Sequence, residues 1–334
     1  MLPTSPARLL FLLAALIFSL PLTASSQIHE SMGIRAQGMA GAFTAVADDA
    51  SAIWWNPAGL ATGAYFSMVT ERGRLTGEEA ESSPFQGRNS GFSVVFPALG
   101  FGYNRIRVNE SPALPSIDPE SPNRQEEEAN QLGVRATALS RYGFAFGQSL
   151  GDGIVVGATV KVLRGGQLHD LTGSGPEAAD QLDVPVDTRF SADLGLMVSA
   201  GPVRVGATVR NVNEPRFADN GGDLRLKRGV RLGAAFVGRE VQVPMTLAFD
   251  ADLTREPTPV GDVRHVAAGI EGWLWERRIG LRGGISTNIV GSGGEALSGG
   301  VSVPLPSGLH LEGAITRGSD KSREGWSLGV GATF

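Results

Sequence analysis

The chain has 334 residues, 46 of them glycine and none of them cysteine, and 42% of its residues are hydrophobic. Together with a mean hydropathy near zero, this composition excludes a helical membrane protein and a disordered chain. The lack of cysteine excludes disulfides, thiolate metal sites and a lipidated N-terminal cysteine, and a formal net charge of −5 gives no indication of nucleic-acid binding.

The first 26 residues carry the pattern of a secretory signal peptide. Arg8 precedes an apolar run of about a dozen residues, Leu9 to Leu20, and small residues follow the run. A retained membrane anchor is the alternative, but the run is short for a helix that spans a bilayer. We therefore expect residues 1–26 to be a signal peptide that directs export.

The sequence between the signal peptide and the first predicted strand, residues 27–62, differs from the rest of the chain. Its centre, residues 38–60, is small, apolar and glycine-rich, and it contains the adjacent carboxylates Asp48 and Asp49. Either carboxylate is expected to cap a short helix from residue 50 to about residue 55. The stretch does not resemble the strands that follow it.

The end of this segment contains a double tryptophan and a chain reversal. Trp54 and Trp55 are large enough to fill a wide barrel lumen. Asn56 and Pro57 end the predicted helix, because the residue before a proline avoids helical backbone geometry, and Gly59 provides freedom for the reversal. We predict that residues 27–62 fold inside a barrel as a plug or gate, whose shape is set by Asp48, Asp49, Trp54, Trp55, Asn56, Pro57 and Gly59.

From residue 64 onward, apolar residues alternate with polar or small ones, so each predicted strand has one apolar face. Many of these runs exceed the usual strand of a soluble sheet and match a tilted strand that crosses a bilayer. Tight turns alternate with longer polar loops, as in outer-membrane barrels. We predict an all-β, transmembrane antiparallel barrel over residues 63–334 with about 14 strands, at 64–72, 90–97, 101–109, 130–150, 154–164, 186–200, 202–212, 225–238, 241–253, 263–275, 278–288, 295–304, 309–317 and 324–334.

The span 130–150 is long for one strand, and we predict a bulge near residues 140–142 because splitting the span would give an odd number of strands.

If the apolar face of each strand meets lipid, the opposite face points into the lumen. That face carries charges that are expected to pair between neighbouring strands. Two interpretations remain open: a structural network of ion pairs, or the lining of a substrate path. The predicted lumen charges are Arg225, Lys227, Arg231, Asp250, Asp252, Glu271 and Arg282.

The sequence gives no indication of an enzyme. Its four histidines are scattered without metal-binding spacing, and no Gly-x-Ser-x-Gly elbow joins a strand to a helix. We therefore expect no catalytic residues, no metal and no cofactor.

The last strand alternates up to a terminal aromatic residue, Phe334. This pattern resembles the C-terminal signal that the barrel-assembly machinery of Gram-negative bacteria recognises. It predicts insertion into the outer membrane, with outer-membrane lipid and the assembly machinery as partners, and a monomeric barrel.

The stretch Gly-Met-Ala-Gly-Ala-Phe-Thr-Ala-Val-Ala-Asp-Asp-Ala-Ser-Ala-Ile-Trp-Trp-Asn-Pro-Ala-Gly-Leu, residues 38–60, resembles the N-terminal signature of FadL-type outer-membrane transporters and of the related PorV/PorQ family, with wording closer to PorV/PorQ. The resemblance implies a 14-stranded barrel with an internal plug. The FadL branch implies passive transport of hydrophobic small molecules such as fatty acids across the outer membrane. The PorV branch implies an accessory barrel for protein secretion, with secretion-system proteins as partners. A structural barrel without transport is the third alternative.

Overall fold

The computed structural model describes residues 32–77, 85–110, 134–170, 180, 182–217, 224–238, 244–258, 261–290, 294–318 and 324–334. The predicted signal peptide and residues 27–31 of the predicted plug lie outside these ranges, so both remain predictions.

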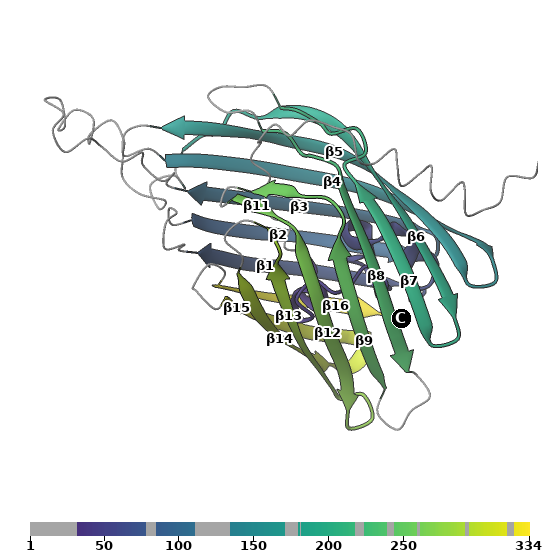
Figure 1. The fold of residues 1–334 in the computed structure, drawn as a ribbon. Coiled ribbons are helices and arrows are strands. Elements are labelled where there is room, and N and C mark those ends of the chain that lie inside the picture. The colour runs from purple at the N-terminus through teal and green to yellow at the C-terminus, as the bar shows by residue number, and fades with distance from the viewer. Residues whose placement is uncertain are drawn as a thin grey trace, which may run out of the picture.

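Fourteen strands form a closed antiparallel barrel, as the sequence predicted (Figure 1). Each barrel strand pairs with its neighbours along the chain, and the first strand pairs with the last, with Ser67 opposite Thr333, so the ring has no free edge. The barrel strands are β1 (Ser67–Gly77), β2 (Phe85–Phe96), β3 (Leu99–Glu110), β4 (Val134–Gly151), β5 (Ile154–Asp170), β6 (Asp187–Ala200), β7 (Val203–Arg210), β8 (Gly229–Gly238), β9 (Met245–Asp252), β12 (His265–Leu274), β13 (Ile279–Asn288), β14 (Glu295–Pro304), β15 (Leu309–Gly318) and β16 (Glu324–Thr333).

The predicted bulge in the long fourth strand is wrong. Residues 140–142 pair without interruption with both β3 and β5, and the register shift of β4 lies instead between Ser149 and Gly151. That position adjoins the tight turn to β5, where Gly153 has a φ of 77°. The connection between the predicted strands 241–253 and 263–275 contains a separate two-stranded sheet of β10 (Glu256–Thr258) and β11 (Gly261–Val263).

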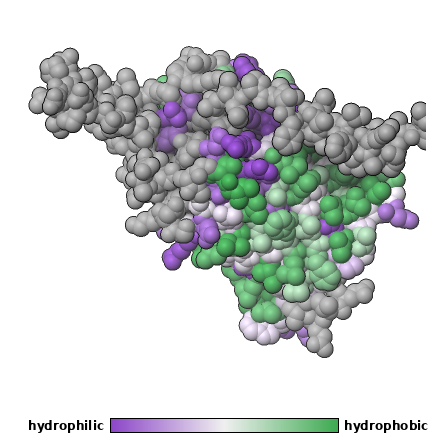
Figure 2. Space-filling model, viewed as in Figure 1, coloured by the Kyte–Doolittle hydropathy of each residue, from purple (hydrophilic) through white to green (hydrophobic). Residues whose placement is uncertain are grey.

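The two faces of the wall differ in chemistry. Outward-facing apolar side chains are solvent-accessible around the ring, with Phe190, Leu297 and Leu328 each at least 60% exposed. Figure 2 shows hydrophobic residues covering much of the visible wall. Inward-facing positions alternate with these residues and are buried, for example Ser327 on β16 and Asp193 on β6.

Short and long connections lie at opposite ends of the barrel. The end with long connections, which we call the loop end, includes residues 78–84, 111–133 and 211–228. The end with tight turns, which we call the turn end, includes the connections around Ala98, Gly153 and Gly201. The chain enters β1 from the turn end.

The helical elements are short: α2 (Ile34–Gly38), α3 (Ala52–Trp55), and the 3₁₀ turns η1 (Pro57–Ala61) and η3 (Pro306–Gly308). No helix within the described ranges is long and apolar enough to cross a membrane.

Candidate functional site

Residues 32–62, which we call the inner segment, lie within the ring of strands (Figure 1). Helix α2 contacts β13, β14, β15 and β16, whereas α3 and η1 contact β3, β4, β5 and β6 on the other side of the ring. A segment that touches both sides of a closed barrel occupies its lumen. Most of its residues are buried, and many of its apolar side chains are inaccessible to solvent.

Inward-facing glycines of the wall make room for the inner segment. A Cβ atom on Gly157 of β5 would lie 2.2 Å from the carbonyl carbon of Pro57, and one on Gly284 of β13 would lie 2.5 Å from the carbonyl carbon of Met39. Because a backbone cannot yield as a side chain can, any larger residue here would displace the segment. The high glycine content of the chain therefore serves close contact between wall and segment.

The turn of helix α3 is built differently from the prediction. Ser51 occupies the position before the helix, so neither Asp48 nor Asp49 is its cap residue. Asp49 Oδ1 instead accepts hydrogen bonds from the backbone N–H and the hydroxyl of Ser51, at 2.8 and 2.5 Å. Asp48 bonds to Arg35, 2.6 Å away. The two carboxylates thus fix the loop before the helix.

Asn56 ends the helix in an extended conformation, as predicted, and ties the segment to itself and to the wall. Its Nδ2 donates to the carbonyl oxygens of Thr44 and of Leu196 on β6, and its Oδ1 accepts from Ala58 N–H. Pro57 starts η1.

Gly59 has a reason for being glycine other than the predicted conformational freedom. A Cβ on this residue would lie 1.7 Å from the carbonyl oxygen of Ala47. The requirement is therefore close approach between two parts of the inner segment.

The double tryptophan divides between the two sides of the lumen. Trp54 donates its indole N–H to Ser93 Oγ at 3.0 Å, and the Arg141 guanidinium lies 5.2 Å from its ring centre. Trp55 donates to the carbonyl oxygen of Met32 at 2.7 Å and lies 5.4 Å from the Arg231 guanidinium. Both rings therefore contact inward-facing arginines of the wall, an arrangement that adds cation–π attraction to apolar burial.

Arg35 connects the inner segment to the charged face of the lumen. Its guanidinium lies 2.6 Å from Glu271 on β12, 2.6 Å from Asp48 and 3.3 Å from Asp49. Arg282 on β13 lies 2.8 Å from Glu271. The predicted pairing of charges between neighbouring strands is therefore present at Glu271 and Arg282, and it extends into the segment through Arg35.

A second polar connection holds the middle of the segment. Asp250 on β9 accepts the backbone N–H groups of Phe43 and Thr44, at 3.1 and 2.9 Å. Arg231 and Asp252, on neighbouring strands, form an ion pair of 2.6 Å. Asp250 orients the segment, because it supplies the acceptor that two buried backbone N–H groups need. Arg231 adds a hydrogen bond of 3.4 Å to the carbonyl oxygen of Gly41.

Two predicted lumen charges lie outside the barrel strands. Strand β8 begins at Gly229, so Arg225 and Lys227 belong to the connection between β7 and β8. Arg225 forms an ion pair with Glu214 in the same connection, and the Lys227 carbonyl accepts a hydrogen bond from Asn211.

Within that connection, residues 215–217 pair antiparallel with residues 224–226, and we call this pair the hairpin. Leu224 and Leu226 alternate like strand residues because they pack, each 1% exposed, on inward-facing apolar side chains of β3, β4 and β5. The cluster comprises Ile106, Val108, Leu139, Leu163, Phe217, Leu224 and Leu226. The predicted boundary at residue 225 was therefore wrong because the apolar alternation marks burial inside the mouth of the barrel.

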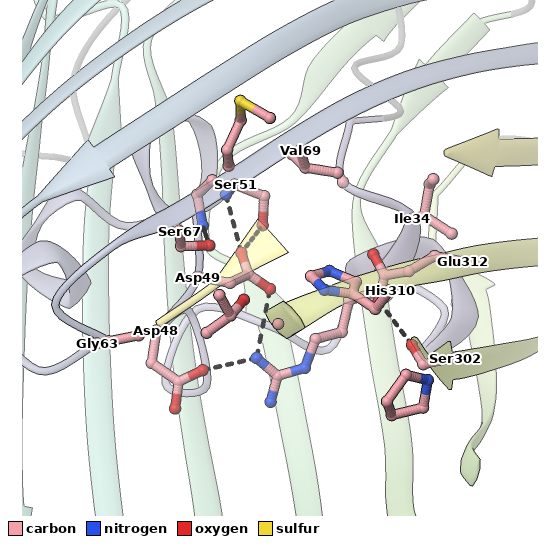
Figure 3. A pocket seen from close by; sticks show the side chains of 18 of the residues that line it. Ile34, Asp48, Asp49, Ser51, Gly63, Ser67, Val69, Ser302, His310 and Glu312 are labelled. Atoms are coloured by element: carbon pink, nitrogen blue, oxygen red, sulfur yellow. Dashed lines mark hydrogen bonds and ion pairs between the residues drawn. The ribbon is translucent and has the colours of Figure 1, made fainter. Parts of the chain in front are cut away.

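A cavity of about 650 Å³ lies between the inner segment and the wall near the turn end (Figure 3). Its lining combines apolar residues with the charged groups of Arg35, Asp48, Asp49 and Glu312. Burial raises the pKa of Asp49, while the neighbouring Arg35 charge acts to lower it. No group of three or more His, Asp or Glu side chains suited to a metal ion occurs in the part of the chain that the structure describes.

The last residue takes part in ring closure. Phe334 exchanges two backbone hydrogen bonds with Phe66, at 3.0 and 3.1 Å, and its side chain is 64% exposed beside the Phe66 ring.

The closed 14-stranded barrel matches solved structures of FadL- and TodX-type channels. The CymD monoaromatic hydrocarbon channel aligns with a TM-score of 0.61 and 14% identity, over 91% of this chain and 98% of that one. The toluene transporter TbuX of Ralstonia pickettii aligns with a TM-score of 0.61 and 14% identity, over 91% and 99%. A FadL homologue of Pseudomonas aeruginosa aligns at 0.55 and 10% identity, over 93% and 99%. At these identities the likeness establishes the fold.

Residues 82–252, just over half of the chain, match the family model TraF_2, described as "F plasmid transfer operon, TraF, protein", and the chain belongs to that family. No curated protein matches the sequence. The resemblance to PorV/PorQ is not confirmed by these comparisons.

Proposed function

We propose that the chain is an outer-membrane barrel for passive transport of hydrophobic small molecules, in which the inner segment is the plug. The observation that carries the proposal is the occupied lumen of a FadL- and TodX-type barrel, whose exterior is apolar. Such an exterior suits a bilayer. The structural neighbours include proteins described as a monoaromatic hydrocarbon channel and a toluene transporter.

The plug divides the lumen into two chemically different sides. On one side, Ile53, Trp54 and Leu60 of the inner segment are buried and lie against glycines of β3 and β4. On the other side, Arg35 and its carboxylate partners hold the segment to β12. A hydrophobic molecule would pass on the apolar side, where the described contacts between wall and plug are apolar packing, hydrogen bonds and the contact of Arg141 with Trp54.

A reversible disulfide tests this proposal directly, because the chain contains no cysteine. A Cβ on Gly100 of β3 would lie 3.0 Å from Cγ1 of Ile53, so the double substitution I53C/G100C places two thiols within disulfide reach. The oxidised variant fixes the plug to the apolar side of the wall. We expect slow uptake of a labelled hydrophobic compound such as toluene into cells that express it, and recovery after reduction.

The matched control is S298C/T316C, which joins β14 to β15 where the two hydroxyls lie 3.0 Å apart and leaves the plug unrestrained. Oxidation of the control should not change uptake. If cells with the barrel take up a broad panel of hydrophobic compounds no faster than cells lacking it, that result would contradict transport. It would leave the structural barrel without transport as the supported alternative.

An accessory role in protein secretion is the second candidate. One observation favours it: the family is described by a protein of the F plasmid transfer operon. Affinity purification of the intact barrel from detergent-solubilised outer membranes should then recover secretion components. Recovery of the barrel alone, as a monomer, would exclude this role.

We also propose that Phe334 is read by the barrel-assembly machinery, since its side chain is exposed next to the closing strand pair. Replacing Phe334 with Ala should reduce the amount of folded barrel in the outer membrane. Replacing the equally exposed Phe190 should leave that amount unchanged.

A further inference from the structure

Six arginines gather on the outward face of neighbouring strands near the loop end. Three of them stand directly opposite one another in the ladder, because Arg74 pairs in register with Arg88, and Arg88 with Arg107. The next row toward the turn end places Arg72, Arg105 and Arg164 on β1, β3 and β5, separated by Ser90 and Ser140. We call these six residues the arginine band.

The outward orientation of the band follows from the alternation of the strands. On β1, Glu71 and Gly73 face inward and are buried, so Arg72 between them faces outward and is exposed. The same alternation exposes Arg105 and Arg164. Like charges on adjacent strands repel each other, so such an arrangement requires a compensating partner.

The described residues supply part of that compensation, at Arg88 and Arg107. Asp180 lies 2.6 Å from Arg88 and 4.0 Å from Arg107. Among the described parts of the chain, Arg72, Arg105 and Arg164 form no ion pair with a carboxylate. The charge of Asp183 also acts on Arg107, so the band with Asp180 and Asp183 carries a net charge of about +4 at neutral pH.

An aromatic row lies directly beneath the band, two residues closer to the turn end on each strand. Phe92, Tyr103 and Tyr142 pair in register across β2, β3 and β4, and the Tyr103 and Tyr142 rings lie 5.0 Å apart. Below them the outward residues are apolar, among them Phe101 and Phe144. Aromatic side chains of this kind mark the boundary between acyl chains and headgroups in membrane barrels.

The opposite part of the wall has no such row. At the loop end of β14, β15 and β16 the exposed outward residues are Glu295, Arg317 and Glu324, and Arg317 stands opposite Glu324 in the ladder. Among the described outward residues at these loop ends, the charge is therefore positive on β1 to β5 and slightly negative on β14 to β16.

We propose that the arginine band binds the phosphorylated headgroup of a membrane lipid in the leaflet at the loop end, with the acyl chains against the aromatic and apolar rows. Guanidinium groups match phosphate in charge and in bidentate geometry. The position at the headgroup boundary selects a lipid over a soluble phosphate compound, because only a lipid also covers the apolar rows. This proposal rests on the membrane location proposed above, but it does not depend on transport.

Native mass spectrometry of the full barrel, released from detergent after titration with bis-phosphorylated lipid A, tests the proposal. The variant R72Q/R105Q/R164Q should bind the lipid roughly 100-fold more weakly, since each arginine near an anionic headgroup contributes about fivefold. The control R228Q/R278Q/R317Q removes three exposed arginines elsewhere and should bind like the parent. The lysine triple variant, which keeps the charge, should retain most of the affinity.

Further arms identify what is recognised. A phosphate-free diacylglycerol should not bind, and inorganic phosphate at millimolar concentration should not displace lipid A. Four outcomes would each overturn the proposal. These are equal weakening in the control variant, equal binding of diacylglycerol, full displacement by inorganic phosphate, and adducts characteristic of an adventitious ion only. If the triple variant fails to fold, R105Q alone should still show a fivefold loss. Uptake of hydrophobic compounds is measured separately, so failure of transport leaves this test unaffected.

Discussion

The hydrogen bonds of Asp250 give a quantitative test of how firmly the inner segment is held. Its buried carboxylate, 1% exposed, accepts the N–H groups of Phe43 and Thr44. In the variant D250A both N–H groups lose their acceptor while the wall around them stays closed to water. Each orphaned donor costs about 1–3 kcal/mol, so a value of about 1.5 kcal/mol for each gives a total of about 3 kcal/mol.

This loss is measurable as local opening. A single cysteine introduced at Ala45, which is fully buried in the segment, is the sole thiol of the chain. Its rate of labelling by a water-soluble maleimide reports how often the segment leaves the wall. A loss of about 3 kcal/mol corresponds to labelling roughly 150-fold faster in D250A than in the parent.

Two further variants separate the acceptor from its charge. D250N keeps an acceptor oxygen and should accelerate labelling less than tenfold. D152A, which removes an exposed carboxylate of the turn between β4 and β5, should change nothing. Labelling of D250A within threefold of the parent would refute the reasoning, since it would mean that these two hydrogen bonds do not hold the segment.

Three other perturbations follow from the packing. G269A should destabilise the folded barrel in lipid vesicles by about 1–3 kcal/mol, because its Cβ would lie 2.7 Å from a carbonyl oxygen of the inner segment. A Cβ on Gly272 of the same strand meets nothing within 4 Å, so the stability of G272A should lie within about 0.5 kcal/mol of that of the parent. Equal urea midpoints for the two variants would contradict this. K161M should cost about 3–5 kcal/mol by the same measurement, because it leaves Asp193 buried without its cation at 2.7 Å, and the double variant with D193N should recover part of the loss. L226A removes a buried side chain of the loop-end cluster, and trypsin should then cleave the hairpin at least tenfold faster; an unchanged rate would show that the cluster does not hold it.

The barrel could be predicted from the sequence because its determinants are local. Alternation with period two and the rhythm of short and long connections depend on neighbouring residues alone, and they gave the number of barrel strands and the closed ring. The start of the strand predicted at 225–238 was wrong because the alternation continues at Leu224 and Leu226, in a hairpin that packs inside the mouth. Periodicity shows that one face of a segment is buried, but it does not show which part of the molecule covers that face.

The contacts of the inner segment depended on information that no local pattern carries. Asp48, Asp49 and Asn56 could be singled out because they stand in a distinctive stretch. Their partners on the wall could not, because Asp48 pairs with Arg204 of β7 and Asn56 bonds to Leu196 of β6. Arg35 was missed because it precedes that stretch without a motif, although it joins three carboxylates. Gly59 was recognised as special for the wrong reason, since close approach to Ala47 and backbone freedom favour glycine equally in a sequence.

The start of the inner segment touches both strands that close the ring. Gly33 donates its N–H to Glu71 on β1, while the side chain of Ile34 lies against Gly329 on β16. These two halves of one docking surface come together only when the first and last strands pair. The order of assembly is constrained accordingly. A nascent barrel whose first and last strands are not yet paired offers only half of this docking surface. The inner segment can therefore dock fully only after the ring has closed.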